Sequence, residues 1–148
     1  MMVQSPPSRD VLDKLGVYRG QAVSVVGRGD PQLLRRVHQR IGRPLAKEGF
    51  RADLILFWPQ KPSDVSTRLR ALRTSIFPEG AIWVITPKKG RRGCNGMPYL
   101  EEAQLIPLGL TAGLVDNKIC SISETESARR FVWRRKDRSR EGRKANGK

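Results

Sequence analysis

Cysteine, histidine and long apolar runs are scarce in this sequence, and each scarcity excludes a class of protein. Two cysteines, Cys94 and Cys120, are too few for a disulfide framework and too isolated for a metal site. The single histidine, His38, has no serine, cysteine or acidic partner at a recognisable spacing, so we expect it on a helix surface. No apolar run approaches the roughly 20 residues that a membrane helix needs, and the N-terminus lacks the apolar region of a secretory signal. These features predict a cytoplasmic protein with no metal site and no membrane span.

Acidic residues are few relative to basic ones. The 148 residues include 29 Lys and Arg against 14 Asp and Glu, which gives a formal net charge of +15 and a pI near 11.0. Residues 129–148 alone hold ten basic and two acidic residues, a net +8, so residues 1–128 carry the remaining +7. Such a charge attracts polyanions, namely nucleic acid, an anionic membrane surface or acidic proteins. High solubility is the alternative explanation, and composition alone leaves both open.

The length and the hydrophobic pattern predict one α/β domain at residues 10–138, between a disordered N-terminus at 1–9 and a disordered basic tail at 139–148. Apolar runs of strand length predict strands at 21–26, 53–58, 81–86, 114–123 and 129–135. Apolar residues at helical spacing predict helices at 10–15, 30–41, 65–76 and, in part, 99–112. This alternation favours a single Rossmann-like, three-layer domain, with a mostly parallel sheet and an antiparallel terminal strand.

Three local features carry more specific expectations. We expect Ser63 or Asp64 to cap the helix that follows the second strand. The segment at 78–80, Pro-Glu-Gly, is expected to form a turn before the third strand. Pro107 and Gly109 are expected to kink or interrupt the last helix, because proline cannot donate the internal hydrogen bond.

The order of elements resembles the class I methyltransferase fold, in which strands and helices alternate and lead to a hairpin with a reversed final strand. Between the positions of Gly27 and Asp53, that fold places two further strands and a helix, with an acidic residue that holds the cofactor ribose. This chain has only 25 residues there, and its glycine loop is a lone Gly-Arg-Gly at 27–29. The resemblance therefore implies a fold whose cofactor half is cut down, and we predict no cofactor.

Two motifs stand out along the chain. One is the segment 83–89, and the other is Leu-Val-Asp-Asn-Lys-Ile-Cys at 114–120 with the basic sequence that follows it up to Arg138. Both resemble motifs of a bacterial family known as domain of unknown function 3052. The resemblance covers most of residues 10–138. It departs at Glu126, where a tryptophan is expected, and in a longer basic loop after the first motif. It implies the fold and carries over no catalytic residue.

Cationic side chains follow the first three predicted strands, at the edge where open α/β sheets bind ligands. We predict an anion site, called the cationic rim below, made of Arg28, Lys61, Lys88, Lys89, Arg91 and Arg92. The helix that begins near Asp30 points its N-terminus at the same edge, which favours an anion further. A cationic sulfonium cofactor would suit this rim poorly. The alternative is a set of solvated basic loops.

Three other residues each allow two interpretations. Trp58, at a strand exit, could stack on a nucleic-acid base, although a tryptophan in a strand is usually part of the core. Cys94 could have a pKa lowered by the neighbouring arginines, or be a merely exposed thiol. Asp116 could pair with Lys118 at a strand edge, or it could pin the terminal hairpin against a helix end.

Taken together, these features predict a non-catalytic module that binds a polyanion, in the first place nucleic acid, with no catalytic residue and no metal. A minimal methyltransferase-like or other nucleotide-using enzyme is one alternative, and a regulatory domain that binds an acidic protein is another. A cofactor site would separate the enzyme from the binding module, and the sequence contains neither an acidic ribose ligand nor a full glycine loop. The oligomeric state and the identity of the ligand stay open.

Overall fold

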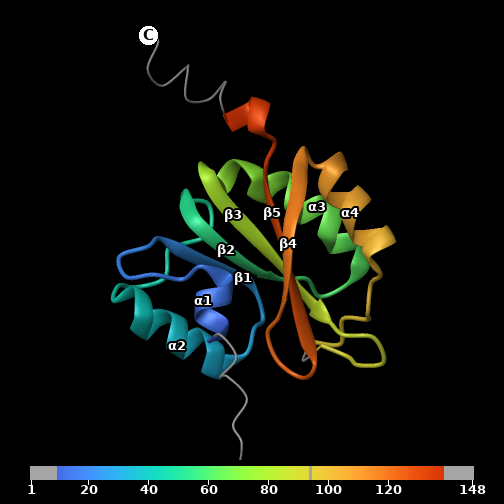
Figure 1. The fold of residues 1–148 in the computed structure, drawn as a ribbon, viewed down its shortest axis with the longest axis horizontal. Coiled ribbons are helices and arrows are strands. Elements are labelled where there is room, and N and C mark those ends of the chain that lie inside the picture. The colour runs from blue at the N-terminus through green and yellow to red at the C-terminus, as the bar shows by residue number, and fades with distance from the viewer. Residues whose placement is uncertain (1–9, 94, 139–148) are drawn as a thin grey trace, which may run out of the picture.

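The computed structural model describes residues 10–93 and 95–138, and Figure 1 shows one sheet with helices on both faces. The strands are β1 (Val23–Gly27), β2 (Ala52–Trp58), β3 (Ile76–Pro87), β4 (Leu114–Ser121) and β5 (Glu126–Trp133). The helices are α1 (Val11–Leu15), α2 (Pro31–Ile41), α3 (Pro62–Leu72) and α4 (Glu102–Thr111), with a 3-10 turn at Arg73–Ser75. The segments 1–9 and 139–148, for which disorder is predicted, and Cys94 lie outside the described residues.

The five strands lie in the order β1-β2-β3-β5-β4. β1, β2 and β3 are parallel, whereas β5 is antiparallel to both β3 and β4. The short connection at 122–125 leaves no room for a crossover helix, so β4 and β5 form a hairpin. β5 then lies beside β3 and leaves β4 at the edge of the sheet. The predicted α/β fold, with a mostly parallel sheet and a reversed terminal strand, is confirmed.

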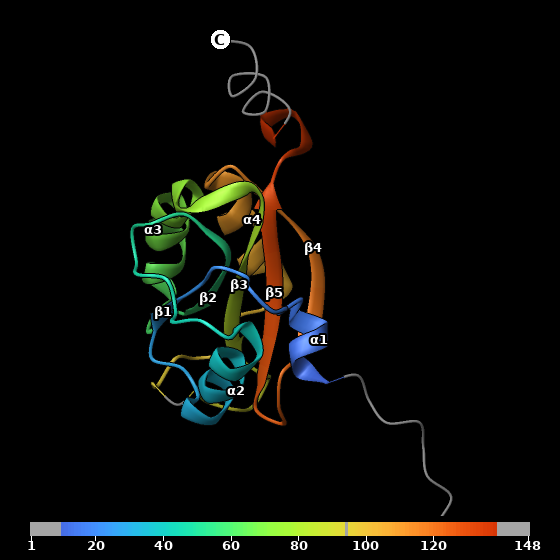
Figure 2. The same cartoon turned by 90° about the vertical axis from the view of Figure 1, so that its left-hand side faces the viewer.

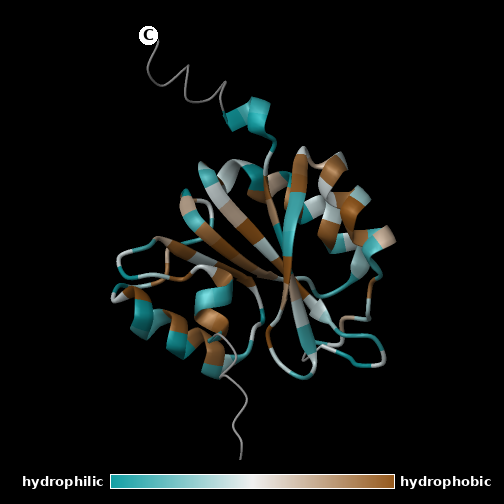
Figure 3. Ribbon diagram, in the orientation of Figure 1, coloured by the Kyte–Doolittle hydropathy of each residue, from teal (hydrophilic) through white to brown (hydrophobic). Residues whose placement is uncertain are grey.

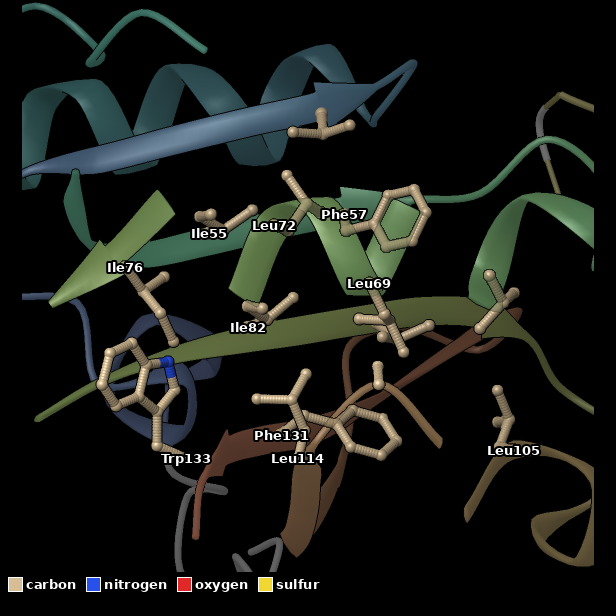
Figure 4. Packing of buried hydrophobic residues seen from close by; sticks show 14 of the residues in the cluster. Ile55, Phe57, Leu69, Leu72, Ile76, Ile82, Leu105, Leu114, Phe131 and Trp133 are labelled. Atoms are coloured by element: carbon tan, nitrogen blue, oxygen red, sulfur yellow. The ribbon is translucent and has the colours of Figure 1, made fainter. Parts of the chain in front are cut away.

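Each face of the sheet buries its own hydrophobic cluster. α3 and α4 lie on one side of the strands and α1 on the other (Figure 2). On the side of α3 and α4, Ile82 and Phe131 from the central strands lie among the buried side chains in Figure 4. On the side of α1 and α2, Leu56 and Trp83 are buried. The apolar runs of the sequence predict that Leu56 and Val84 are fully buried, and both are.

Helix α2 begins and ends where the sequence predicts. Asp30 is its N-cap and accepts a hydrogen bond from the N–H of Gln32 at 3.1 Å, and Pro31 takes the first helical position. Gly42 ends the helix in the left-handed conformation, with a φ of 71°. Hydrophobic and hydrophilic residues alternate along α2 in Figure 3, as in an amphipathic helix that packs on a sheet.

Helix α3 begins earlier than predicted and lacks the predicted cap. Pro62 takes the first helical position, and the N-cap residue Lys61 makes no side-chain hydrogen bond to the helix. Proline suits a first position because its φ is already helical and it has no N–H to satisfy. Ser63 and Asp64 therefore lie within the first turn, and the prediction that one of them caps the helix is wrong.

The predicted turn at 78–80 is an irregularity within the single strand β3. The pairing of β3 with β2 shifts register between Ile76 and Ala81, so extra residues of β3 are accommodated there. A β carbon on Gly80 would lie 2.8 Å from the Asp53 carbonyl oxygen, so only glycine allows this close approach. Pairing with β2 on both sides of the irregularity keeps the strand continuous, and the prediction of a separate turn is wrong.

Helix α4 runs through Pro107 without interruption. A capping box between Glu101 and Gln104 holds its first turn. A β carbon on Gly109 would collide with the ring of Phe131, so the glycine lets the helix approach β5 closely. Packing against the sheet outweighs the one hydrogen bond that proline removes. The predicted interruption is therefore wrong, and Gly109 has a packing role.

Candidate functional site

The carboxyl ends of β1, β2 and β3 lie at one edge of the sheet, where the loops that follow them line a cavity of about 460 Å³. Gly27 and Arg28 come from the end of β1 and its loop, and Trp58 and Gln60 from the end of β2. Asn95 comes from the loop between β3 and α4. Open α/β sheets bind ligands at this edge. The fold therefore brings three separate loops together at one candidate site.

Trp58 occupies the space beside the glycine loop. It is 2% exposed, and a β carbon on Gly29 would lie 2.6 Å from its ring. Gly27, with a φ of 90°, passes so close to the Trp58 carbonyl that any side chain would collide with it. The close approach of Trp58 therefore accounts for both glycines without a ligand. A base could stack on so buried a ring only after neighbouring groups moved.

Replacing Gly29 by alanine should destabilise the protein by about 1–3 kcal/mol, because the added methyl group overlaps the Trp58 ring. Chemical denaturation of the parent and the variant measures the difference. The same substitution in a Trp58→Phe background is the control, because the smaller ring leaves room for the methyl group. We expect a smaller cost in that background. Equal costs in both backgrounds would contradict this account of the glycine loop.

The loop between β3 and α4 is anchored to the rest of the fold. Asn95 Nδ2 donates a hydrogen bond to the Pro59 carbonyl oxygen at 3.1 Å, which ties the loop to the end of β2. Met97 is buried in the hydrophobic cluster beneath α3 and α4. Arg91 and Arg92, the two rim arginines of this loop, therefore lie on a folded segment close to its anchors.

The six residues of the cationic rim lie at or near this edge. Lys88 is half-buried, and its Nζ donates a hydrogen bond to Ser121 Oγ at 2.7 Å. The other five are exposed, namely Arg28, Lys61, Lys89, Arg91 and Arg92. Within residues 10–93 and 95–138, the three rim lysines and the two arginines of the β3–α4 loop form no ion pair with a carboxylate. Such a group of uncompensated cations attracts anions.

Two carboxyl groups of the chain, those of Asp30 and Glu126, lie at the same edge. Asp30 caps α2, so a carboxylate of the chain itself already lies at the helix N-terminus that was expected to favour an anion. Glu126, the first residue of β5, is buried, and burial raises the pKa of its carboxyl group. A hydrogen bond from Trp58 Nε1 at 3.4 Å opposes this rise, and the charge of Asp30 adds to it. The only sequence signal for Glu126 is its departure from the family pattern.

Asp116 pairs with a residue that sequence reasoning does not identify. Its Oδ2 accepts a hydrogen bond from Arg129 Nη1 at 2.9 Å, and Arg129 Nη2 lies 3.1 Å from Glu102 Oε1 at the start of α4. A register shift between Asp116 and Lys118 separates those two residues along β4. Asp116 therefore holds Arg129 within the hairpin, and Arg129, not Asp116 itself, links the hairpin to the start of α4. The predicted pair of Asp116 with Lys118 is wrong.

The remaining side chains with potential chemistry do not gather into a site. His38 is exposed on α2, and Cys120 is half-buried on β4. The described residues contain no group of three or more histidine, cysteine, aspartate and glutamate side chains placed to hold a metal ion. Across the same residues, no helix has the length and apolar character to cross a membrane.

Comparison with solved structures identifies the class of fold as that of the methyltransferases. A SAM-dependent methyltransferase from Aquifex aeolicus aligns with a TM-score of 0.64 and 15% identity, over 82% of this chain and 86% of that chain. A TehB-like SAM-dependent methyltransferase from Corynebacterium glutamicum gives a TM-score of 0.53 and 11% identity, over 84% of this chain and 85% of that chain. The mitomycin 7-O-methyltransferase MmcR aligns with a TM-score of 0.60 and 15% identity. The alignment covers 84% of this chain but only 53% of MmcR. At these identities, the likeness establishes the fold alone.

The sequence identifies the family. The chain belongs to the family described as protein of unknown function DUF3052, whose model matches residues 12–135. The family resemblance noted in the sequence is therefore confirmed. No curated protein matches this chain in sequence.

The residues at this edge do not fit S-adenosylmethionine, the cofactor that the fold implies. Trp58 lies against Gly29, where the glycine loop would have to make room for a ligand. Beside β1, where the resemblance places further strands, the described residues form a single parallel bridge between Ser24 and Ala46. The uncompensated rim cations also disfavour a sulfonium ion. We therefore derive no catalytic step through this cofactor.

Proposed function

We propose that this protein is a non-catalytic module that binds nucleic acid through the cationic rim. The observation that carries the proposal is the position of the six rim cations, which follow three neighbouring strands at the edge where such sheets bind ligands. Five of them have no carboxylate partner within the described residues. The anchored β3–α4 loop supports the proposal further, because cations on a folded segment lose less freedom on binding.

The chemistry of the rim suits a row of phosphates. Arginine can bind phosphate through two parallel hydrogen bonds, and lysine acts as a mobile point charge on a flexible stem. Each phosphate that a cation neutralises releases condensed counterions, so affinity depends strongly on salt. The formal net charge of +15 adds long-range attraction, which speeds the encounter at low ionic strength.

The proposal predicts salt-dependent binding of oligonucleotides by the parent protein. We expect the logarithm of the binding constant to fall linearly with the logarithm of salt concentration, with a slope of roughly 0.7–0.9 per phosphate contact. Fluorescence anisotropy at several salt concentrations measures the slope, with polyglutamate as a competitor. Absence of binding at about 50 mM salt would overturn the proposal. Binding of polyglutamate as tight as that of the oligonucleotide would favour an acidic protein partner.

The same account predicts that S-adenosylmethionine does not bind at concentrations below about 1 mM, which corresponds to roughly 4 kcal/mol of binding free energy. The physical reason is that Trp58 lies against the glycine loop. Isothermal titration calorimetry of the parent protein is the measurement, and an oligonucleotide titration of the same sample shows that the protein is competent to bind. A saturable isotherm with a micromolar constant would contradict the prediction and favour the methyltransferase-like alternative.

A further inference from the structure

A second cavity, of about 300 Å³, lies beside the cationic rim on the face that α4 covers. Its walls come from the end of β3, the start of β5, the edge strand β4 and the segment that leads into α4. Lys88 and Lys89 of the rim are part of its lining. The apolar residues of its wall are Tyr99, Leu100, Leu105, Ala128 and Ile119. Below we call it the Tyr99 cavity. Its residues differ from those that line the cavity next to Trp58.

The polar groups of the Tyr99 cavity are partly unsatisfied. Thr86 is 5% exposed, and its hydroxyl makes no hydrogen bond within the described part of the chain. Arg129 is equally buried, and although two carboxylates hold its terminal nitrogens, its Nε has no partner. Most buried polar groups in proteins have a hydrogen-bond partner. The Thr86 hydroxyl is not among the buried atoms that lack a partner, so it stays accessible in the wall of this open cavity and is available to a polar atom of a ligand.

The apolar wall of the cavity is open to solvent on both sides. Tyr99 and Ile119 are among the large hydrophobic residues that stay exposed, at 37% and 56%. Tyr99 comes from the segment before α4, whereas Ile119 comes from β4, so the two lie on different walls. A flat aromatic ligand could be held between such walls, with its polar edge toward Thr86.

We propose that the Tyr99 cavity receives a nucleobase of a single strand whose phosphates lie on Lys88 and Lys89. This inference rests on the proposed function and specifies it. The two lysines belong both to the rim and to the cavity, so backbone and base contacts would be adjacent, as they are along a nucleic-acid strand. In a duplex the bases are stacked and paired, so only a strand with free bases could place one in the cavity.

Oligonucleotides with and without bases test this inference. We expect the parent protein to bind a mixed-sequence single strand about tenfold more tightly than an abasic strand of the same length, and also more tightly than a duplex. Tyr99→Ala should remove most of that preference and leave the affinity for the abasic strand and its salt slope unchanged. Thr86→Val, which keeps the shape and removes the hydroxyl, should reduce the preference in part. Tyr18→Ala, on the chain's other tyrosine near the start of β1, is the matched control and should change neither affinity.

The outcomes separate this inference from the function on which it rests. Equal binding of base-bearing and abasic strands by the parent would overturn the inference and leave rim binding intact. A Tyr99→Ala variant that loses affinity for both strands equally would also overturn it, because Tyr99 would then act only through the loop. Thermal melts of every variant establish that it is folded. Binding of neither strand by the parent would overturn the proposed function and the inference together.

Discussion

Replacing Leu56 by alanine is expected to lower the free energy of unfolding by about 2–4 kcal/mol. Leu56 has no exposed surface, and it lies in β2 between β1 and β3, with Val25 and Trp83 opposite it in the two registers. The loss combines the transfer free energy of the removed methyl groups with the cavity that they leave. A domain of this size holds only about 5–15 kcal/mol in total, so one such substitution removes a large share.

Chemical denaturation of the parent and the Leu56→Ala protein measures this difference. Leu110→Ala is the matched control, because it makes the same chemical change on α4 at a residue that is 44% exposed. We expect the control to cost well under about 1 kcal/mol, since little apolar area leaves the interior. Equal midpoints for the Leu56→Ala protein and the parent would contradict the central position of β2.

Neutralising four rim cations should weaken nucleic-acid binding more than an equal change of charge elsewhere. The variant replaces Lys88, Lys89, Arg91 and Arg92 by glutamine. If each contacts one phosphate, the salt slope for a single strand should fall by roughly 3, at about 0.7 per contact. At about 100 mM salt a loss of that size amounts to more than a hundredfold in affinity, since each lost contact also removes its counterion release.

The matched control neutralises four exposed cations at or near the amino edge of the sheet, which also lowers the formal net charge by four. These four residues are Arg19, Lys47, Arg70 and Arg135. None of them makes an ion pair with another described residue. Long-range attraction falls equally in both variants, so only local contacts distinguish them. Filter binding at several salt concentrations compares the two with the parent. Equal losses in both variants would mean that the rim is an ordinary solvated basic surface.

Deletion of residues 139–148 completes this comparison. The deletion removes four basic residues and one acidic residue. We expect it to weaken binding to every nucleic acid similarly and to flatten the salt dependence, but with a smaller loss per charge than the rim variant. The reason is that the rim cations lie on folded loops at one edge, so they lose little conformational freedom on binding. An equal loss per charge would again contradict the binding site.

Local signals in the sequence determined most of the secondary structure. Asp30, Pro31 and Gly42 mark the ends of α2, because capping and left-handed backbone depend on residues within one turn. The continuous apolar run of β2 identified a strand covered on both faces. The order of strands and helices then predicted the mostly parallel sheet and the edge at which three loops meet. The cationic rim could be named for the same reason, since its residues follow those strands directly.

Contacts between distant segments decided the rest. Trp58 and Glu126 are 68 residues apart in the sequence, yet their side chains form a hydrogen bond at the sheet edge. The Trp58 residue also packs against Gly27 and Gly29, so these glycines are needed for packing. Arg129 is held by carboxylates from β4 and α4, which no spacing within β5 could indicate. The Tyr99 cavity likewise needs walls from four elements. Spacing and propensity report on neighbours in the chain, whereas a buried partner or a cavity exists only once the sheet and its helices have packed.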